Sequence, residues 1–294
     1  MKICSFRRAV ACAAFSVTAA LAAPAHAARV GVLSNQYFAE TAAGFNAAVA
    51  GHAFTAIDVG ATTPSLAVLT ASYDVLLLFE DGTFPNAANV GDVVAAFANS
   101  GRPVVLGAFY DQDRTDSPPD IIPHGWGALE TIDPNTTDGM ATPYAARSLN
   151  TGTLVPHDLT AGLTALSSAR FAGGNDAKPG TIVVAAWTQL NARGKVDPAI
   201  AYRVTGGACV IHVAIAPQYP AIGVAGVDYD GDFHRAWKNA FDFAANGCAA
   251  AGGSADAATA IPALSDSRLA LTALLVAAIG FAQRRRLAWR AGRR

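Results

Sequence analysis

YDVLLLFEDGTFPNAANVGDVVAAFANSGRPVVLGAF, residues 73–109, carries two short apolar runs separated by a helical pattern. The runs VLLLF at 75–79 and VVLGA at 104–108 are apolar at nearly every position, and the pattern over 86–101 is helical. Strands of a parallel sheet have such continuous apolar runs because helices cover both of their faces. The stretch therefore predicts a strand over 73–79, a crossover helix and a second strand over 102–109.

The alternation of strand and helix extends upstream to residue 29. Short β-rich runs at 29–34 and 54–59 alternate with helical patterns at 39–51 and 64–71. Strands that alternate with helices in this way indicate an α/β domain in which neighbouring strands run parallel. We therefore expect a flavodoxin-like, doubly wound and mostly parallel sheet in one domain over 28–248.

Periodicity fades over residues 110–180, where Pro, Asp, Gly and Thr dominate, and we expect a long loop or insertion with fragments of helix and strand. Two strand-like runs and a closing helical pattern follow, at 180–189, 198–217 and 232–246. The pair Gly206 and Gly207 divides the second run and indicates a hairpin turn.

The N-terminal segment reads as a secretory signal peptide over 1–27. It has the basic residues Lys2, Arg7 and Arg8, then an apolar run, then the small residues of Ala25-His26-Ala27. This three-part pattern directs export through the Sec translocon and predicts cleavage after Ala27. A buried N-terminal helix is the alternative.

A small-residue linker at 249–260 separates the body from a C-terminal segment, 261–294. That segment contains an apolar stretch followed by an arginine cluster. We expect the uncharged stretch at 269–282 to form a short transmembrane helix that anchors the protein at least transiently in the inner membrane, although it is shorter than the roughly 20 residues that span a bilayer comfortably. The arginines that follow it favour a cytoplasmic C-terminus, which leaves the body outside; they are Arg284, Arg285, Arg286 and Arg290. A retained anchor, a cleaved signal and a buried helix are the three readings.

Charge is distributed unevenly along the chain. Residues 29–260 hold 11 Lys and Arg against 21 Asp and Glu, a net charge of about −10, although the whole chain carries only −1. An acidic body argues against nucleic acid or anionic lipid as its partner. Cys209 and Cys248 are the cysteines that follow the signal peptide, and export favours a disulfide between them.

Polar residues follow three of the expected parallel strands, and ligands of open α/β sheets bind at that edge. The candidates are Asn35, Glu80, Asp81, Tyr110, Asp111 and Asp113. Their carboxylates would form an acidic crevice for a cation or for sugar hydroxyls, with Tyr110 and Phe84 as stacking surfaces. The alternative is an ordinary turn followed by a solvated loop. No residue spacing indicates a metal site or a cofactor.

The acidic run DYDGDF, residues 228–233, invites a calcium interpretation. An EF-hand loop needs Gly at its sixth position and Glu at its twelfth, whereas Gly231 is fourth here and Asn239 is twelfth. Asp232 is better explained as the N-cap of the closing helix. His124 and His157 are possible ligands or acid–base groups, but neither has the spacing of a zinc site.

The order of elements and two motifs resemble the class I glutamine amidotransferase-like superfamily, in particular its ThuA-like branch. The motifs are VPHDLTAGLTAL at 155–166 and the helix at 232–246, and the matching residues are His157, Gly162, Leu163, Asn239 and Ala240. In the amidotransferases a cysteine nucleophile follows the fourth strand. Ala108 or Phe109 takes that place here, so the resemblance implies that the covalent chemistry is absent.

The tail IPALSDSRLALTALLVAAIGFAQRRR, residues 261–286, resembles an IPTL-CTERM sorting signal of the PEP-CTERM type. The matching residues are Ile261, Pro262, Leu264, Ser265 and Asp266. The resemblance implies processing by an exosortase-type membrane protease in Gram-negative bacteria with an exopolysaccharide-rich envelope.

These observations favour an exported envelope protein that is a non-enzymatic surface or matrix component, with envelope polysaccharide as a ligand. The alternative is a carbohydrate-active hydrolase that uses the acidic crevice, with or without a metal. A third interpretation is a subunit that recruits a partner.

Overall fold

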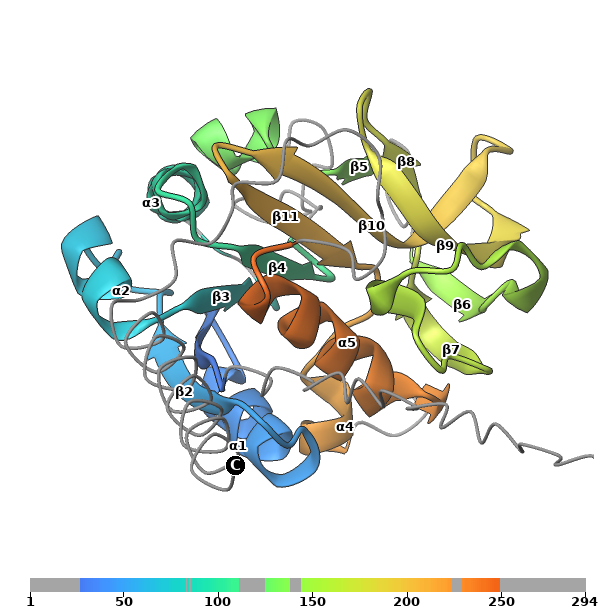
Figure 1. The fold of residues 1–294 in the computed structure, drawn as a ribbon, viewed down its shortest axis with the longest axis horizontal. Helices are drawn as coiled ribbons and strands as arrows, with labels where there is room; N and C mark the ends of the chain where they lie inside the picture. Colours follow the sequence, from blue (N-terminus) through green and yellow to red (C-terminus); the bar gives the residue numbers. More distant parts are fainter. Residues whose placement is uncertain are drawn as a thin grey trace, which may run out of the picture. The chain divides into compact units, whose positions relative to one another are not determined.

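A seven-stranded sheet forms the centre of the body. The computed structural model describes residues 27–248 except 83, 85, 111–124, 138–143 and 224–228. The strand order is β2-β1-β3-β4-β11-β10-β9. The first five strands are parallel, whereas β10 pairs antiparallel with both β11 and β9 (Figure 1). The chain therefore has an α/β fold with a mostly parallel sheet, and its five parallel strands have the flavodoxin-like order.

The elements lie close to the runs expected from the sequence. The parallel strands are β1 (Arg29–Ser34), β2 (Ala53–Asp58), β3 (Val75–Leu78), β4 (Val104–Gly107) and β11 (Ala208–Val213), and the antiparallel ones are β9 (Ile182–Leu190) and β10 (Val196–Thr205). The helices are α1 (Phe38–Ala48), α2 (Leu66–Ser72), α3 (Ala87–Asn99), α4 (Tyr219–Ile222) and α5 (Phe233–Ala245). Every residue of β3 and β4 is buried, as their apolar runs predict.

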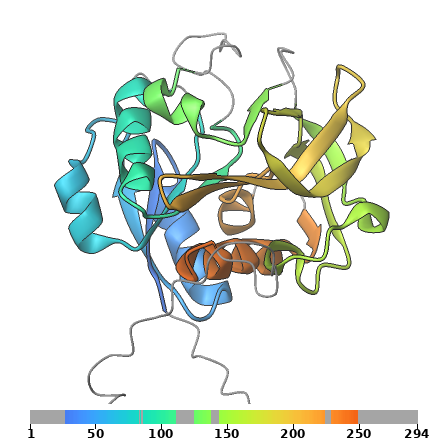
Figure 2. The same cartoon turned by 45° about the horizontal axis from the view of Figure 1, so that its top comes forward.

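Helices cover both faces of the sheet and divide the core in two. On one face α1 and α5 pack around Phe45, Trp237 and Phe241. On the other, α2 and α3 pack with Trp126, which lies beside the 3-10 helix η1 (Gly127–Thr131). In Figure 2 the orange α5 and the teal α3 lie on opposite sides of the sheet. Strands buried on both faces account for the continuous apolar runs at 75–79 and 104–108.

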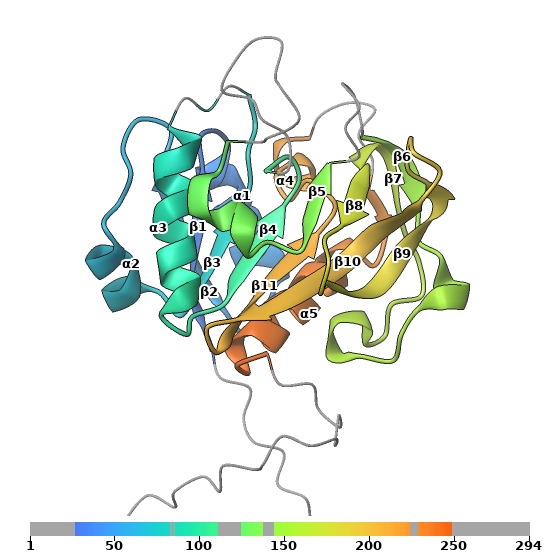
Figure 3. The ribbon, with the colours of Figure 1, turned by 90° about the horizontal axis from the view of Figure 1, so that it is seen from above.

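The described parts of residues 110–180 hold more regular structure than the expected loop. They include β5 (Asn135–Thr137), β6 (Ala145–Ser148), β7 (Leu166–Ala172) and β8 (Asn175–Ala177), and the short 3-10 helices η2 (Thr151–Thr153) and η3 (Asp158–Thr160). β5 pairs with β8, and β6 and β7 form a second small sheet with β12 (Tyr229–Gly231). Figure 3 shows β5 and β8 beside the antiparallel end of the main sheet.

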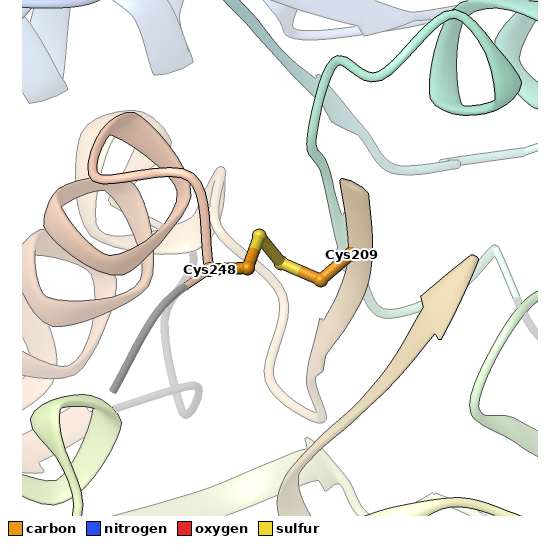
Figure 4. Close-up of a disulfide and its surroundings, with 2 residues drawn as sticks. All are labelled: Cys209 and Cys248. Atoms are coloured by element: carbon orange, nitrogen blue, oxygen red, sulfur yellow. A yellow bond between two sulfur atoms is a disulfide. The ribbon is translucent and has the colours of Figure 1, made fainter. Parts of the chain in front are cut away.

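A disulfide joins Cys209 to Cys248 across 39 residues of sequence. Cys209 lies at the start of β11, and Cys248 follows the end of α5 (Figure 4). The bond therefore fixes the last helix of the body to the middle of the sheet. Disulfides persist in oxidising compartments, so this bond is consistent with export.

The chain divides into a compact unit that ends at Ala251 and a second unit, Gly252–Arg294. The signal peptide expected at 1–27, except Ala27, the linker at 249–260 and the sorting tail at 261–294 lie outside the described residues. Within the part of the chain that the structure describes, no helix is long and apolar enough to cross a membrane.

Candidate ligand site at the carboxyl edge of the sheet

Asn35 and Asp81 meet at the point where the order of the parallel strands reverses. Asn35 follows β1, and Asp81 lies shortly after the neighbouring β3. The Asn35 Nδ2 donates to the Asp81 carbonyl oxygen, and the Asp81 N–H donates to the Asn35 Oδ1 at 3.0 Å. Ligands of open α/β sheets bind at this reversal. The topology thus places two of the candidate residues where a ligand site is expected.

Gln218 is a residue of this site that the sequence did not single out. It is fully buried between β11 and α4, and its Nε2 donates to the Asp81 Oδ2 at 3.0 Å. Its Oε1 has no hydrogen-bond partner in the structure. The apolar run to Pro217 reads as strand, although β11 ends at Val213. A search for polar residues beyond this fifth parallel strand would have found Gln218.

Glu80 follows β3 by two residues and is 1% exposed. The Phe109 N–H donates to the Glu80 carbonyl oxygen at 3.4 Å. Asn35 and Asp81 are half-buried, so their polar groups reach the surface beside this buried carboxyl. A carboxylate accepts hydrogen bonds from hydroxyl groups, and a side-chain amide both accepts them and donates them.

Tyr110 does not face this edge. Its hydroxyl donates to the Asp133 Oδ2 at 2.7 Å and lies 3.1 Å from the Asn135 carbonyl oxygen, in the fully buried layer beneath η1 and β5. Phe84 is also fully buried, with its ring against Trp126 at 5.1 Å between centroids. Neither ring therefore offers a stacking surface to a sugar. Asp111 and Asp113 lie outside the described residues.

The buried layer around Tyr110 shifts the pKa of two groups. Burial is the main cause that raises the pKa of Asp133 to about 6, against the opposing effect of Lys178, whose Nζ binds the Asp133 Oδ1. Burial also lowers the pKa of His212 to about 3. The His212 Nδ1 lies 3.0 Å from the Asn135 Nδ2, and its ring packs edge-on against Tyr110. His212 is therefore a neutral core residue, and Cys209 is held in the disulfide, so the two form no catalytic pair.

Ala108 and Phe109, at the place that the sequence resemblance gives to a nucleophile, are 1% and 4% exposed. The Phe109 ring packs against Tyr144 at 4.6 Å and Phe171 at 5.5 Å between centroids. Tyr219 of α4 completes this aromatic cluster. The turn after β4 therefore carries apolar packing where an acyl-transfer enzyme would present a thiol.

The motif residues around His157 and Asn239 hold a turn against α5. The His157 Nδ1 accepts from the Leu159 N–H at 3.1 Å. The Asn239 Nδ2 donates to the Ala161 carbonyl oxygen at 2.9 Å, and Gly162 has a φ of 67° that favours glycine. These contacts give the residues of the resembling motif a structural role. His124 lies outside the described residues.

Asp232 lies at the N-cap position of α5, but its side chain binds another segment. Its Oδ2 accepts from the Thr164 N–H at 2.7 Å and from the Ala165 N–H at 3.1 Å, and it makes no capping bond to its own helix. The expected hydrogen bond to the first turn of α5 is therefore not formed. The Asp232 carboxylate instead binds the backbone amides of Thr164 and Ala165. Over the described residues, no group of three or more His, Cys, Asp or Glu could hold a metal ion.

Known structures share the fold of the body. A cytoplasmic protein from Salmonella typhimurium LT2 is 10% identical and has a TM-score of 0.50, covering 72% of this chain and 97% of its own. A second cytoplasmic protein from Salmonella typhimurium is 11% identical, with a TM-score of 0.51 and coverages of 73% and 98%. A protein from Bacteroides uniformis ATCC 8492 described as ThuA-like is 14% identical, with a TM-score of 0.46 and coverages of 77% and 94%. Such low identities establish likeness of fold alone.

The C-terminal tail carries a recognised sorting motif. Residues 259–286 match the model of the IPTL-CTERM motif, as the resemblance predicted. This motif is a C-terminal sorting signal, so the chain is an exported protein that an exosortase-type system sorts to the cell envelope. No curated protein matches the sequence.

Proposed function

We propose that this protein is a non-enzymatic component of the cell surface or extracellular matrix, displayed by its sorting tail. The observation that supports this proposal most directly is the apolar turn after β4. Ala108 and Phe109 are buried in an aromatic cluster at the position that the amidotransferase resemblance gives to the nucleophile. A side chain without a thiol or hydroxyl cannot form the covalent intermediate of acyl transfer.

The ligand that we assign to the carboxyl edge is envelope polysaccharide. Asn35, Asp81 and Gln218 form a connected set of amide and carboxylate groups at the strand reversal. A polysaccharide presents many hydroxyl groups, each of which donates and accepts hydrogen bonds. The acidic character of the body disfavours anionic polymers, so neutral sugars suit this surface best.

The rival function is a hydrolase that uses Glu80 and Asp81. Glu80 would be its acid, because a buried carboxyl is the kind of group that such enzymes use to protonate a leaving group. Asp81 accepts a hydrogen bond from Gln218, which holds its carboxylate in place. A substitution at Glu80 therefore distinguishes display from hydrolysis, because Asp81 also belongs to the proposed polysaccharide site.

The test compares two chromosomal variants with the wild type in the producing bacterium. Deletion of 261–294 should release the protein from the envelope and abolish its surface phenotype. Glu80→Gln should keep that phenotype, because the display role needs no proton donor. Loss of the phenotype in Glu80→Gln, at normal abundance and normal melting temperature, would replace the proposal with the hydrolase.

Binding is measured with the full-length protein in detergent and the neutral polysaccharide isolated from the same envelope. Asn35→Ala and Asp81→Asn should each weaken retention on the polysaccharide, whereas Glu40→Gln on the exposed side of α1 should leave it unchanged. Equal retention of all four proteins would remove polysaccharide as the ligand of this edge and leave the envelope role standing.

A further inference from the structure

The body begins with a residue that is buried and hydrogen-bonded. Ala27 is exposed, whereas Ala28 is 3% exposed and belongs to the core that α1 and α5 cover. The Ala28 N–H donates to the His52 Nδ1 at 3.3 Å, and its carbonyl oxygen accepts from the Ala53 N–H at 3.0 Å. The change from exposed to anchored thus falls between Ala27 and Ala28, which is also the expected cleavage position.

His52 is held so that its Nδ1 lone pair faces this nitrogen. Its Nε2 lies 3.0 Å from the Asp242 Oδ1, and its side chain is 1% exposed. Because Nδ1 accepts a hydrogen bond, Nε2 carries the ring proton and donates it to Asp242. The ring packs edge-on against Phe54 and Phe241, which fixes its orientation.

We propose that Ala28 is the N-terminal residue of the mature protein and that its free α-amino group binds His52. A signal peptidase hydrolyses the bond from Ala27 to Ala28 by adding one water, which leaves a carboxylate on Ala27 and an ammonium on Ala28. The ammonium donates to the neutral His52 ring in place of the amide N–H. A hydrogen bond from a charged donor is stronger than one from a neutral amide.

Charged groups of both signs surround this position. Asp242 supplies a negative charge through the imidazole, and Lys238 binds the other oxygen of that carboxylate at 2.6 Å. Asp74 and Arg102 line the same shallow surface groove as Ala28, so they face this end of β1. The aligned order of amine, neutral imidazole and carboxylate lets the charge be balanced without a direct ion pair.

The same geometry sets the order of events. Once β1 has paired with β2, Ala28 is buried and its peptide group is held on both sides. A protease needs several extended residues around the bond that it cuts, and the folded body withholds those after Ala27. Cleavage therefore precedes folding, and folding then seals the new amine against His52.

The first experiment uses the full-length protein purified from the envelope. Its N-terminal sequence should begin at Ala28. At neutral pH, an amine-specific reagent should label its α-amino group slowly, and His52→Phe should remove this protection while keeping an aromatic ring between Phe54 and Phe241. A mature chain that begins elsewhere, or an amine that reacts equally fast in both proteins, would overturn the proposal.

The second experiment moves the amine away from its site. Inserting Gly-Ser between Ala27 and Ala28 should lower the melting temperature by about 2–4 °C in the wild-type background and should have no further effect in His52→Phe. His52→Leu also removes the acceptor at the Nδ1 position and serves as the background if the phenylalanine variant does not fold. An insertion that lowers the melting temperature equally in both backgrounds assigns His52 a merely structural role.

Discussion

The hydroxyl of Tyr110 donates a 2.7 Å hydrogen bond to Asp133 inside the domain, with both side chains fully buried. The chain thus turns inward directly after β4, and the phenol stabilises a carboxyl group that Lys178 also binds. This layer closes the carboxyl edge of β4 with packed side chains. What remains of the predicted crevice lies at β1 and β3.

Asp133 should make stability depend on pH. Its pKa is raised to about 6, chiefly by burial, so the folded state binds this proton more tightly than the unfolded state does. The stabilisation is complete below the unfolded pKa near 4 and is lost as pH rises through 6. Because two pKa units correspond to about 3 kcal/mol, the contribution of Asp133 to the free energy of unfolding should fall by up to that amount between pH 4 and pH 7. His212, whose pKa burial lowers to about 3, has the opposite effect over this range, so the contribution of Asp133 is measured as the difference between the wild type and Asp133→Asn.

Urea unfolding at several pH values checks this expectation. The stability lost in Asp133→Asn should be greatest near pH 4 and should shrink by pH 7, whereas Glu40→Gln, an exposed change, should leave the pH dependence as in the wild type. A loss in Asp133→Asn that stays constant or grows between pH 4 and pH 7 would show that the Lys178 pair outweighs burial.

The parallel strands were predictable because burial on both faces leaves a record in each strand's own sequence. β3 and β4 are apolar at every position, so no distant information is needed to place them. β6 is different, since its buried residue is Arg147, which pairs with Asp197 from 50 residues away. A charged residue read from its neighbours in sequence is predicted to be exposed. Its burial becomes clear only when the distant residue that pairs with it is known.

The candidate site could be predicted from the sequence only in part. Asn35 and Asp81 follow from the rule that ligands bind beyond parallel strands, because that rule needs only the strand order. The direction of the Tyr110 side chain depends on Asp133 and on the layer that carries it, which no pattern near residue 110 encodes. Gln218 was missed because β11 ends earlier than its apolar run.

The buried pair of Arg147 and Asp197 should matter far more than exposed pairs. The Arg147 Nε lies 2.8 Å from the Asp197 Oδ2, and the side chains are 7% and 0% exposed. Arg147→Met leaves a buried carboxylate without its cation, which should cost about 3–5 kcal/mol of unfolding free energy. Arg193→Met removes an exposed guanidinium from Asp176, whose carboxylate Lys195 also binds at 3.0 Å, and should cost less than about 1 kcal/mol. Similar losses in the two variants by urea unfolding would contradict this distinction.

The disulfide should contribute stability through the chain that it closes. A loop closed across 39 residues restricts the unfolded state enough to add about 4 kcal/mol. Cys209→Ala with Cys248→Ala should therefore lower the unfolding free energy by about that amount, and a reductant should destabilise the wild type but not the double variant. A wild type whose melting temperature does not respond to reductant would show that the bond is absent in the exported protein.

Gly91 should be intolerant of alanine although it lies inside α3. A glycine inside a helix is ordinarily less favourable than alanine by about 1 kcal/mol, so propensity alone predicts stabilisation. A Cβ at this position would lie 1.9 Å from the Trp126 carbonyl oxygen, and the Trp126 N–H is bound to Glu130 at 2.7 Å, so this backbone has little room to retreat. Overpacking of this kind costs about 1–3 kcal/mol, and Gly91→Ala should therefore be destabilising.

Gly152→Ala is the matched control, because its Cβ would meet only the Asn150 Oδ1 at 3.5 Å. Thermal unfolding should show a lower midpoint for Gly91→Ala and a nearly unchanged one for Gly152→Ala, whereas a raised midpoint for Gly91→Ala would mean that η1 can move away from α3.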